Sequence, residues 1–422
     1  MIDLIKFSIP FKEEHLIITK SADEQGGIYI DLEAVAKKSG LILSARSVEF
    51  DIDGDLTVKG LNHPFDSLPT HYSGLAMKIY CGTCNRHPCV EIKASPAKLL
   101  QGHNVFGSTD LALCGMELLV NLAVSASKLY EMLNISATVI DRIDVTYSAR
   151  IPTEKQAEQV ISALRNVSNG QTKCTRAQEW ETTCMWNEGS RHRILIAYLK
   201  HPELMRQCQL IKSAIARNPR NLSLRNQLQV MEDPKLQKFS KGLVRFEGRL
   251  KQRFINNFGM PLNFFQAVNY QLSYESDEKS LIADLWHASF KDVLSALEGK
   301  NMNIYSDDNI YEILKNRYFR ITPKGNVTYA KAQRLFGFYR RLVNEGYDGV
   351  LQNMDRATFW RHVSDLLAVG FSKAQLQNLT ADKNNIVPLM QIIQVDFSNQ
   401  RPDWYVEPVS LFEKQMNTIK VA

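Results

Sequence analysis

The sequence predicts an α+β protein in which antiparallel sheets with covering helices form the larger part and a mainly helical domain ends the chain. Up to about residue 300, strand-like stretches of alternating apolar and polar residues recur between amphipathic helical stretches. After that point only helical patterns joined by Gly-containing turns remain. Because 422 residues are too many for one compact core, we expect three parts, at 1–150, 151–301 and 302–422.

The first part, residues 1–150, is strand-rich. SVEFDIDGDLTVKG predicts two strands joined at an Asp-Gly turn, and LAMKIY with CVEIKAS predicts a second pair. MELLVNLAVSASKLYEML predicts a helix covering the sheet, and its charged and amide residues argue against a membrane span. IDRIDVTYSAR predicts the next strand.

The second part restarts with a helix at 153–166, for which Thr153 is the predicted cap. The strand RILIAYLK follows, then two basic helical stretches at 202–217 and 222–231, then the strand GLVRFEGRLKQR. The third part contains YAKAQRLFGFYRRLVNEGYDGV and RATFWRHVSDLLAVGFSKAQLQNL, which predict helical hairpins. Such hairpins can place a recognition helix in DNA, although more often they only pack.

Charge and cysteine content narrow the class of function. The amino terminus lacks the apolar run of a secretory signal, and seven cysteines, an odd number, favour a reducing cytoplasm over a disulfide framework. Between residues 191 and 257 there are fifteen Lys or Arg against four acids. Such a concentration favours a polyanionic partner such as nucleic acid. A solvated helical surface is the alternative.

Four predicted strands combine an apolar face with a face that carries an ionisable group. Glu91, Asp144 and Glu247 lie mid-strand, and Tyr198 stands two residues before Lys200 in RILIAYLK. A sheet that is wet on one side explains this pattern without any function, and Tyr198 is then a packing residue. Carboxylates that converge on a sheet would instead bind Mg²⁺ or Mn²⁺. A phenol beside a metal and an ammonium group could act as a nucleophile.

Other polar residues near these strands are candidates for nucleic-acid contact. Three arginines share the ionisable faces, and SPAKLLQGHNVFG forms a Gly-flanked loop just after Glu91, in which the histidine could also simply hold the loop. The candidates for DNA binding are Lys98, His103, Asn104, Arg142, Arg245 and Arg249.

A compact cysteine motif, CGTCNRHPC, offers Cys81, Cys84, His87 and Cys89 as zinc ligands. Four ligands this close together rarely complete a tetrahedron, so a turn between strands is the preferred interpretation.

Over nearly its full length, the chain resembles the filamentous-bacteriophage replication initiators, the gene II protein endonucleases. The resemblance is carried by LSARSVEFDIDGDLTVKGLNHPFDSLPTHYSG, VEIKASPAKLLQGHNVFGSTDLALC, LRNVSNGQTK, HRILIAYLKH, GLVRFEGRLKQR, FGFYRRLVNEGYDGV and SNQRPDWYVEPV. More distantly, RIDVTY, YLK and RFEGRLK resemble motifs of plasmid rolling-circle initiators of the Rep_trans type.

The resemblance implies a metal-dependent endonuclease that nicks the plus strand of supercoiled phage DNA at the origin. It implies Tyr198 as the nucleophile and Lys200 as a cation that stabilises the phosphate or the phenolate. It also implies Asp144 and Glu247 as ligands of Mg²⁺ or Mn²⁺, with Glu91 as a third ligand. The 5′ end would stay on the tyrosine while the free 3′-OH primes host polymerase, aided by a host helicase. The displaced strand would later be cut again and circularised.

The resemblance also leaves open points. No His-hydrophobe-His pair is present, so a site dominated by carboxylates must replace that metal site. Met302 matches the place where a shorter carboxy-terminal product begins in these phages. A homo-oligomer on the DNA is compatible with the resemblance, and no membrane partner is expected. The alternatives are a non-catalytic DNA-binding replication regulator and a plasmid relaxase of the same chemistry.

Overall fold

The structure, a computed structural model, describes residues 1–19, 27–41, 47–50, 56–60, 66–83, 86–165, 182–298, 307–321, 326–371, 373–379 and 395–411. The predicted Asp-Gly turn, Cys84 and Met302 lie outside these residues, and the boundary at 302 stays a prediction. Among the described residues, no helix is both long enough and apolar enough to cross a bilayer.

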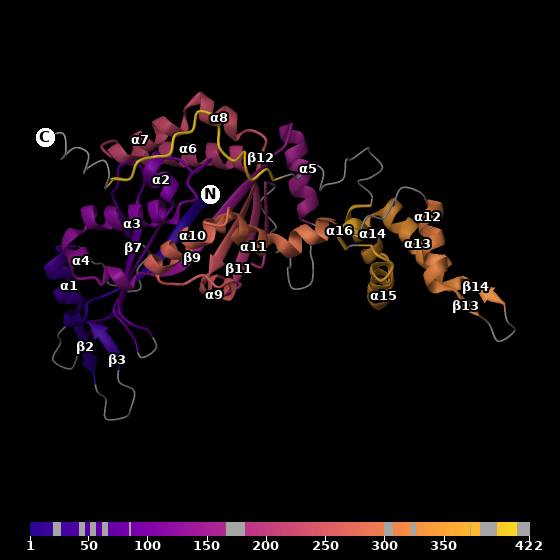
Figure 1. Ribbon diagram of the computed structural model, residues 1–422, viewed down its shortest axis with the longest axis horizontal. Coiled ribbons are helices and arrows are strands. Elements are labelled where there is room, and N and C mark those ends of the chain that lie inside the picture. The colour runs from indigo at the N-terminus through magenta and orange to yellow at the C-terminus, as the bar shows by residue number, and fades with distance from the viewer. Residues whose placement is uncertain are drawn as a thin grey trace.

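One eight-stranded antiparallel sheet organises the larger part of the molecule, in the order β10-β11-β12-β9-β1-β8-β7-β6 (Figure 1). The two predicted rounds of strands therefore join in a single sheet, because β9 pairs with both β1 and β12. The strands are β1 (Ile2–Pro10), β6 (Asp66–Leu68), β7 (Leu75–Tyr80), β8 (Cys89–Ala94), β9 (Val139–Arg150), β10 (Thr183–Trp186), β11 (Arg193–Leu199) and β12 (Leu243–Lys251).

One face of the sheet is apolar and carries the main core. Phe7 of β1 and Phe246 of β12 are fully or almost fully buried on it. The Phe7 ring packs 5.0 Å from that of Phe264, and the indole of Trp286 donates to the Phe246 carbonyl at 3.0 Å. Each such buried side chain contributes roughly 1.5–3 kcal/mol to folding. The covering helices are α3 (Leu111–Ser125), α4 (Ser127–Glu131), α5 (Glu154–Leu164), α9 (Gln252–Phe258), α10 (Phe264–Glu275) and α11 (Leu281–Glu298).

The opposite face of the sheet is polar and is covered at one end. Helices α2 (Pro96–Gln101), α6 (Lys200–Arg217), α7 (Leu222–Met231) and α8 (Pro234–Ser240) lie there. Of these, α6, α7 and α8 share a small second core with the loop after α2 and the start of β12. It is formed by Val105, Phe106, Leu204, Cys208, Met231, Leu236 and Leu243. The rest of the polar sheet face, beside these helices, is not covered by them.

The third part is helical, as expected, and lies beside the sheet region in Figure 1. Its helices are α12 (Asp307–Tyr318), α13 (Ala330–Glu345), α14 (Tyr347–Gln352), α15 (Arg356–Leu367) and α16 (Lys373–Asn378), with a two-stranded piece of β13 (Arg320–Ile321) and β14 (Val327–Thr328). Leu314, Phe338 and Phe359 belong to a core of its own. The separate core explains why the sequence changes character here.

The last described segment, 395–411, returns to the sheet region and crosses it as a strap (Figure 1). Phe397 packs with its ring centroid 4.6 Å from that of Tyr147, and Trp404 lies 5.3 Å from Phe106. The helical part is therefore connected at both of its ends to the sheet region.

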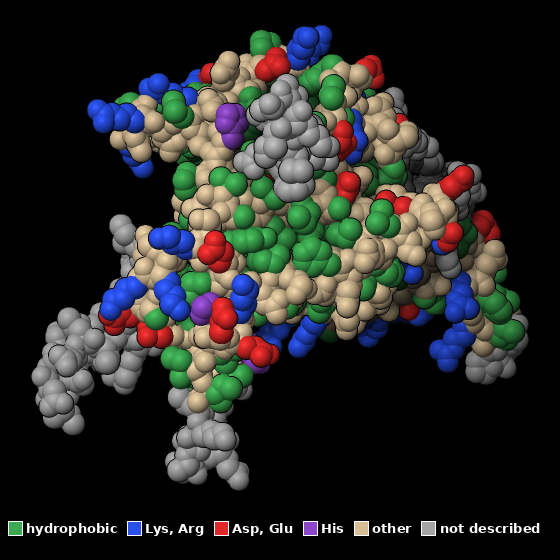
Figure 2. All heavy atoms as spheres, turned by 60° about the vertical axis from the view of Figure 1, so that its left-hand side comes forward, with side chains coloured by type: hydrophobic (Ala, Val, Ile, Leu, Met, Phe, Trp, Pro, Cys, Tyr) green, Lys and Arg blue, Asp and Glu red, His purple; other side chains and the backbone are tan. Residues whose placement is uncertain are grey.

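Smaller hairpins and helices complete the chain: β2 (Leu16–Thr19) with β3 (Gly27–Ile30), β4 (Ser47–Phe50) with β5 (Leu56–Gly60), and α1 (Leu32–Ser39). Figure 2 shows apolar side chains gathered over the middle of one face of the molecule, with charged side chains mostly towards its margins.

Most predicted elements are confirmed, including the cap, since Thr153 accepts a hydrogen bond from the amide of Gln156. Two placements were wrong. RILIAYLK ends as a strand at Leu199, and Lys200 begins α6. Pro202 falls in the first turn of that helix, where proline is tolerated. Lys98 lies on α2 and not in a loop.

Candidate active site

The register of β11, β12 and β9 brings three predicted residues onto one face of the sheet. Arg245 of β12 lies opposite Tyr198, Arg249 of β12 lies opposite Asp144, and Glu247 stands midway between the two arginines. Residues directly opposite in an antiparallel pair, and residues two apart along a strand, share a face. Tyr198, Glu247 and Asp144 therefore form a diagonal across three adjacent strands.

This diagonal lines a cavity of roughly 710 Å³ on the polar face. Seven of the predicted site residues line it: Lys98, Asn104, Arg142, Asp144, Tyr198, Glu247 and Arg249. Asp3, Glu203, Arg206 and Gln207 also line it, and the sequence had not identified them. The cavity is thus bordered by both the sheet and α6.

The Tyr198 side chain is largely buried. The residue is 9 % exposed, and burial raises the pKa of the phenol well above its usual value, although the nearby Arg245 guanidinium lowers it. The phenol is therefore protonated at neutral pH and needs cations around it before it can attack. Arg245 supplies one such cation, because its guanidinium also interacts with the Tyr198 hydroxyl.

Lys200 supplies a second cation next to the phenol. It is fully buried at the start of α6, and its Nζ lies 6.0 Å from the centre of the Tyr198 ring. Nζ donates to Asn104 Oδ1 at 2.9 Å and to Glu203 Oε2 at 2.6 Å. Burial lowers the pKa of Lys200 to about 8, while Glu203 opposes the decrease. The ammonium group is therefore still mostly protonated at neutral pH, although it holds its proton less tightly than a lysine in water.

Asp144 and Glu247 form a buried pair of carboxylates, with residue exposures of 1 % and 5 %. Arg142 binds both oxygens of Asp144, and Arg249 Nε lies 2.7 Å from Glu247 and 3.9 Å from Asp144. Burial, and also the charge of Glu247, raises the pKa of Asp144 to about 7. Arg142 and Arg249 neutralise the two carboxylates in this structure, so a divalent cation bound between them would have to displace these ion pairs.

Comparisons with known proteins place this chain in a family. A family model for the amino-terminal region of the phage replication-associated protein, the gene II protein, matches residues 1–277, and one for its carboxy-terminal region matches residues 321–411. The chain belongs to the gene II protein family of filamentous phages.

The replication-associated proteins of two phages illustrate how completely the family covers this chain. The one from Salmonella phage IKe is 54% identical over 418 residues, covering 98% of each chain. The one from Enterobacteria phage M13 is 54% identical over 409 residues, covering 97% of this chain and 99% of its own. Among solved structures, a rolling circle replication initiator protein from Geobacillus stearothermophilus has a TM-score of 0.24 and 12% identity, and covers 62% of this chain and 80% of its own. That likeness is too weak to relate individual residues.

Glu91, the third carboxylate expected in this member of the gene II protein family, does not join the other two. It lies on β8 and pairs with Lys6 at 2.8 Å and Arg86 at 2.6 Å. Burial would raise its pKa, but the hydrogen bonds from these two cations lower it. Within the part of the chain that the structure describes, no group of three or more acidic, His or Cys side chains could hold a metal. The expected three-carboxylate grouping is therefore not present.

His103 and Arg245 are buried and do not line the 710 Å³ cavity of this gene II family member. Burial lowers the pKa of His103 to about 3, and its Nδ1 accepts from the Val105 amide at 3.3 Å. Both terminal nitrogens of Arg245 donate to the carbonyls of Asn104 and Val105. The two side chains hold the loop after α2 in place, and direct DNA contact by them stays a prediction.

The other residues predicted to contact DNA line the cavity: Lys98, Asn104, Arg142 and Arg249. Lys98 Nζ donates to Gln207 Oε1 at 2.8 Å, and Asn104 donates to Asp3 Oδ1 at 2.8 Å while accepting from Lys200. The register of β1 and β9 shifts between Ile2 and Leu4, as in a β-bulge, and both Asp3 and Leu4 line the cavity. A bulge turns a side chain away from simple alternation, so no sequence signal could have placed Asp3 here.

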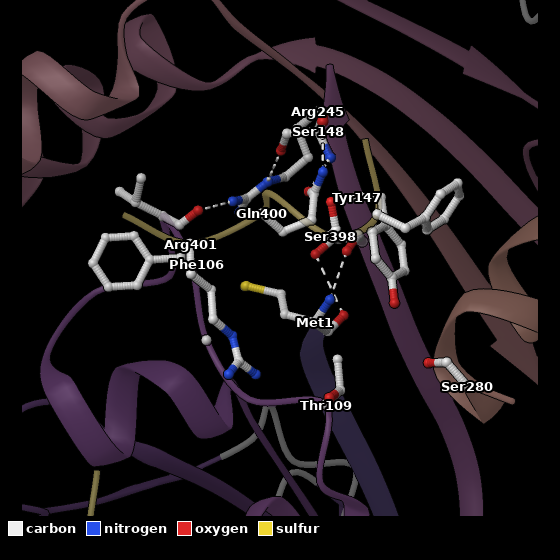
Figure 3. A pocket seen from close by; sticks show the side chains of 14 residues that line it. Met1, Phe106, Thr109, Tyr147, Ser148, Arg245, Ser280, Ser398, Gln400 and Arg401 are labelled. Atoms are coloured by element: carbon white, nitrogen blue, oxygen red, sulfur yellow. Dashed lines mark hydrogen bonds between the residues drawn. The ribbon is translucent and has the colours of Figure 1, made fainter. Parts of the chain in front are cut away.

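A second cavity, of roughly 270 Å³, is lined by Arg245 and lies where the strap meets β9 (Figure 3). The Gln400 side chain accepts from the Ser148 amide at 2.7 Å and donates to the Ser148 carbonyl at 2.9 Å. The Gln400 side chain thereby takes the place of a neighbouring strand, because β1 no longer pairs with β9 at Ser148. The strap thus extends the hydrogen bonding of β9 beyond the end of β1.

Proposed function

We propose that this member of the gene II protein family is a metal-dependent endonuclease that nicks and rejoins one DNA strand and so initiates rolling-circle replication of phage DNA. The observation that carries the proposal is the diagonal of Tyr198, Glu247 and Asp144 in one cavity. Arginines border the same cavity, as a phosphodiester substrate requires. The proposed substrate is the origin in supercoiled duplex DNA of the phage, in the cytoplasm of the bacterial host.

The carboxylate pair suits Mg²⁺ or Mn²⁺. Mg²⁺ commonly binds through one or two carboxylates, substrate phosphate and several waters, so a third protein ligand is not needed. Asp144 and Glu247 would hold the ion, and Arg142 and Arg249 would release them or turn towards phosphate. When bound, the ion would withdraw charge from a phosphate oxygen.

The protein's own groups would perform the strand transfer. The Tyr198 oxygen attacks phosphorus, a phosphotyrosine bond forms, and the bond to the 3′ oxygen breaks. The phenolic proton leaves during the attack, and a proton must reach the departing 3′ oxygen. Lys200 and Arg245 stabilise the phenolate that develops. The energy of the broken ester is kept in the phosphotyrosine bond, so a 3′-OH can later attack it and close a circle without a nucleotide cofactor.

The free 3′-OH would serve host polymerase as a primer, with a host helicase opening the duplex. The competing function is a non-catalytic DNA-binding regulator of replication, and the plasmid relaxase alternative differs in origin and not in chemistry. The two classes separate on whether Tyr198 becomes esterified.

The first prediction compares Tyr198→Phe with Tyr147→Phe on supercoiled DNA that carries the phage origin, with Mg²⁺ present. Tyr147 is a matched control because it is buried on the apolar face of β9, which β12 separates from the strand of Tyr198. We expect Tyr198→Phe to bind the origin normally but to lose nicking and the covalent DNA adduct, and Tyr147→Phe to retain both. Nicking by Tyr198→Phe would remove Tyr198 as the nucleophile. No nicking by the unmodified protein would favour the regulator.

A further inference from the structure

Four basic residues lie side by side across four strands of the polar sheet face. The register pairs Lys251 of β12 with Arg142 of β9, Arg142 with Lys6 of β1, and Lys6 with Lys93 of β8. We call Lys251, Arg142, Lys6 and Lys93 the basic row. Neighbouring strands are roughly 4.8 Å apart, so the basic row is about 14 Å long.

Like charges placed directly opposite each other destabilise a sheet. Burial, and then the charges of Lys6 and Arg142, lowers the pKa of Lys93, and burial with the charge of Arg142 lowers the pKa of Lys251. Carboxylates nearby relieve this repulsion only in part. On this stretch of the described sheet face we find seven cations (Lys6, Lys78, Arg86, Lys93, Arg142, Arg249 and Lys251) and four carboxylates (Glu91, Asp141, Asp144 and Glu247). The repulsion indicates a surface that is completed by an anion.

The basic row is open to solvent and continuous with the Tyr198 cavity. The side chains of Lys6 and Arg142 are each 26% exposed, and Lys93 and Lys251 are half-buried. Arg142 also lines the cavity itself. An extended anion in the cavity can therefore continue directly onto the row.

The surroundings of the basic row suit one nucleic-acid backbone and not two. The adjacent row on one side pairs Asp144 with Arg249, and the one on the other side pairs Glu91 with Lys78 and with Ser8. These rows lie roughly 7 Å from the basic row. In a duplex the second backbone runs about 6–12 Å away across a groove, so it would meet carboxylates that cancel the cations beside them.

We propose that the basic row binds the backbone phosphates of a single DNA strand that leads to or from Tyr198. The proposal rests on the proposed function, because it assigns a path to the same substrate. Lys6, Lys93 and Lys251 thereby become phosphate-binding residues in addition to Arg142. Contacts of this kind position the strand without reading its sequence.

The second prediction uses the full-length double variant Lys93→Gln/Lys251→Gln, which leaves the ion pairs of Lys6 and Arg142 intact. Lys128→Gln is the control, because Lys128 is an exposed lysine on α4, remote from this face. Binding of a fluorescent oligodeoxythymidine of about 20 nucleotides and of a duplex of about 20 base pairs is measured in EDTA from roughly 50 to 200 mM salt. Each lost phosphate contact to a single strand lowers the slope of log K against log salt by about 0.7.

We expect the double variant to bind the single strand roughly tenfold more weakly at about 0.1 M salt, with the slope reduced by about 1.4 and an unchanged urea midpoint. An unchanged slope, or a loss confined to the duplex, would overturn the proposal. Formation of the Tyr198–DNA adduct by the unmodified protein is measured in parallel. If the adduct forms while the slope stays unchanged, the basic row alone is wrong. If no adduct forms, the proposed function fails whatever the binding result.

Discussion

The protonation state of Asp144 decides when the carboxylate pair can accept a divalent cation. Burial first, and the Glu247 charge as well, raises its pKa to about 7, while Arg142 opposes the rise. Below that pH the folded protein holds a neutral carboxylic acid, which is a poor metal ligand. The ionised fraction of Asp144 therefore rises with pH over a range well above that of an ordinary aspartate.

The third prediction is therefore that the Mg²⁺ concentration for half-maximal nicking falls as pH rises from about 6 to about 8. Asp144→Asn should lower nicking on the order of 100-fold, since metal stabilisation contributes several kcal/mol, and should abolish this pH dependence. Glu91→Gln is the matched control, because Glu91 lies outside the cavity, and we expect it to keep the Mg²⁺ requirement of the unmodified protein. An Mg²⁺ requirement independent of pH, or one altered most by Glu91→Gln, would contradict this assignment.

At the residue scale, strand alternation was sufficient to place Tyr198, Asp144 and Glu247 on a polar face. Alternation assigns a face but does not say which strands are neighbours. For that reason it grouped Glu91 with the other carboxylates, although β1 separates its strand from β9. Burial is equally hidden from alternation, so Arg245 could not be recognised as a residue that holds the loop, whereas for His103 this role was one of the two alternatives.

At the scale of elements, the position of β12 is fixed by close packing against α11. A Cβ atom added to Gly248 would lie 2.8 Å from the hydroxyl oxygen of Ser289, which is fully buried on α11. Gly248 is adjacent to Glu247. The close packing of Gly248 against α11 therefore also fixes the position of the Glu247 carboxylate on the opposite face of the sheet. A glycine within a strand commonly marks such an approach.

The fourth prediction is that Gly248→Ala lowers the free energy of unfolding by about 1–3 kcal/mol, measured by urea titration, because the new methyl group overpacks the interface. Adding Ser289→Ala removes the clashing oxygen and should restore most of the loss. If the two changes were simply additive, the contact between β12 and α11 would not be the cause.

Elements with strong periodicity could be predicted, and two failures have clear reasons. The central strand β1 alternates Ile5, Phe7 and Ile9, yet nothing local shows that it joins the two halves of the sheet. Lys200 continues the alternation of RILIAYLK, but the chain turns into α6 at that residue. Pro202, in the first turn of α6, is the local signal for a helix start that alternation alone overlooks.

At the scale of the whole molecule, the strap couples the end of the chain to the sheet. The Phe397 ring lies 4.6 Å from that of Tyr147 and 5.4 Å from that of Trp286, and Gln400 completes the edge of β9. The predicted division of the chain into three parts captured the change from sheet to helices along the sequence. It could not show that residues 395–411 return, because contacts between distant segments leave no periodic signal.

The fifth prediction is that Phe397→Ala speeds amide hydrogen exchange in β9 and β12 but not in α13 and α15. The reason is that a half-buried ring packed on the main core would be lost, at a cost of about 1–2 kcal/mol. Trp360→Ala, in the helical part and 42% exposed, should leave β9 and β12 unaffected. Faster exchange confined to the helical part would show that the strap does not support the sheet.

The central claim is that the Tyr198 oxygen becomes joined to DNA. Origin DNA that carries a label in the nucleotide directly 3′ of the nick is incubated with the protein and Mg²⁺. The product is digested with protease and nuclease, and the modified peptide is sequenced by mass spectrometry. We expect a nucleotide on the tyrosine of the peptide that contains IAYLK. A free 5′ phosphate, or a nucleotide on any other residue, would contradict the account.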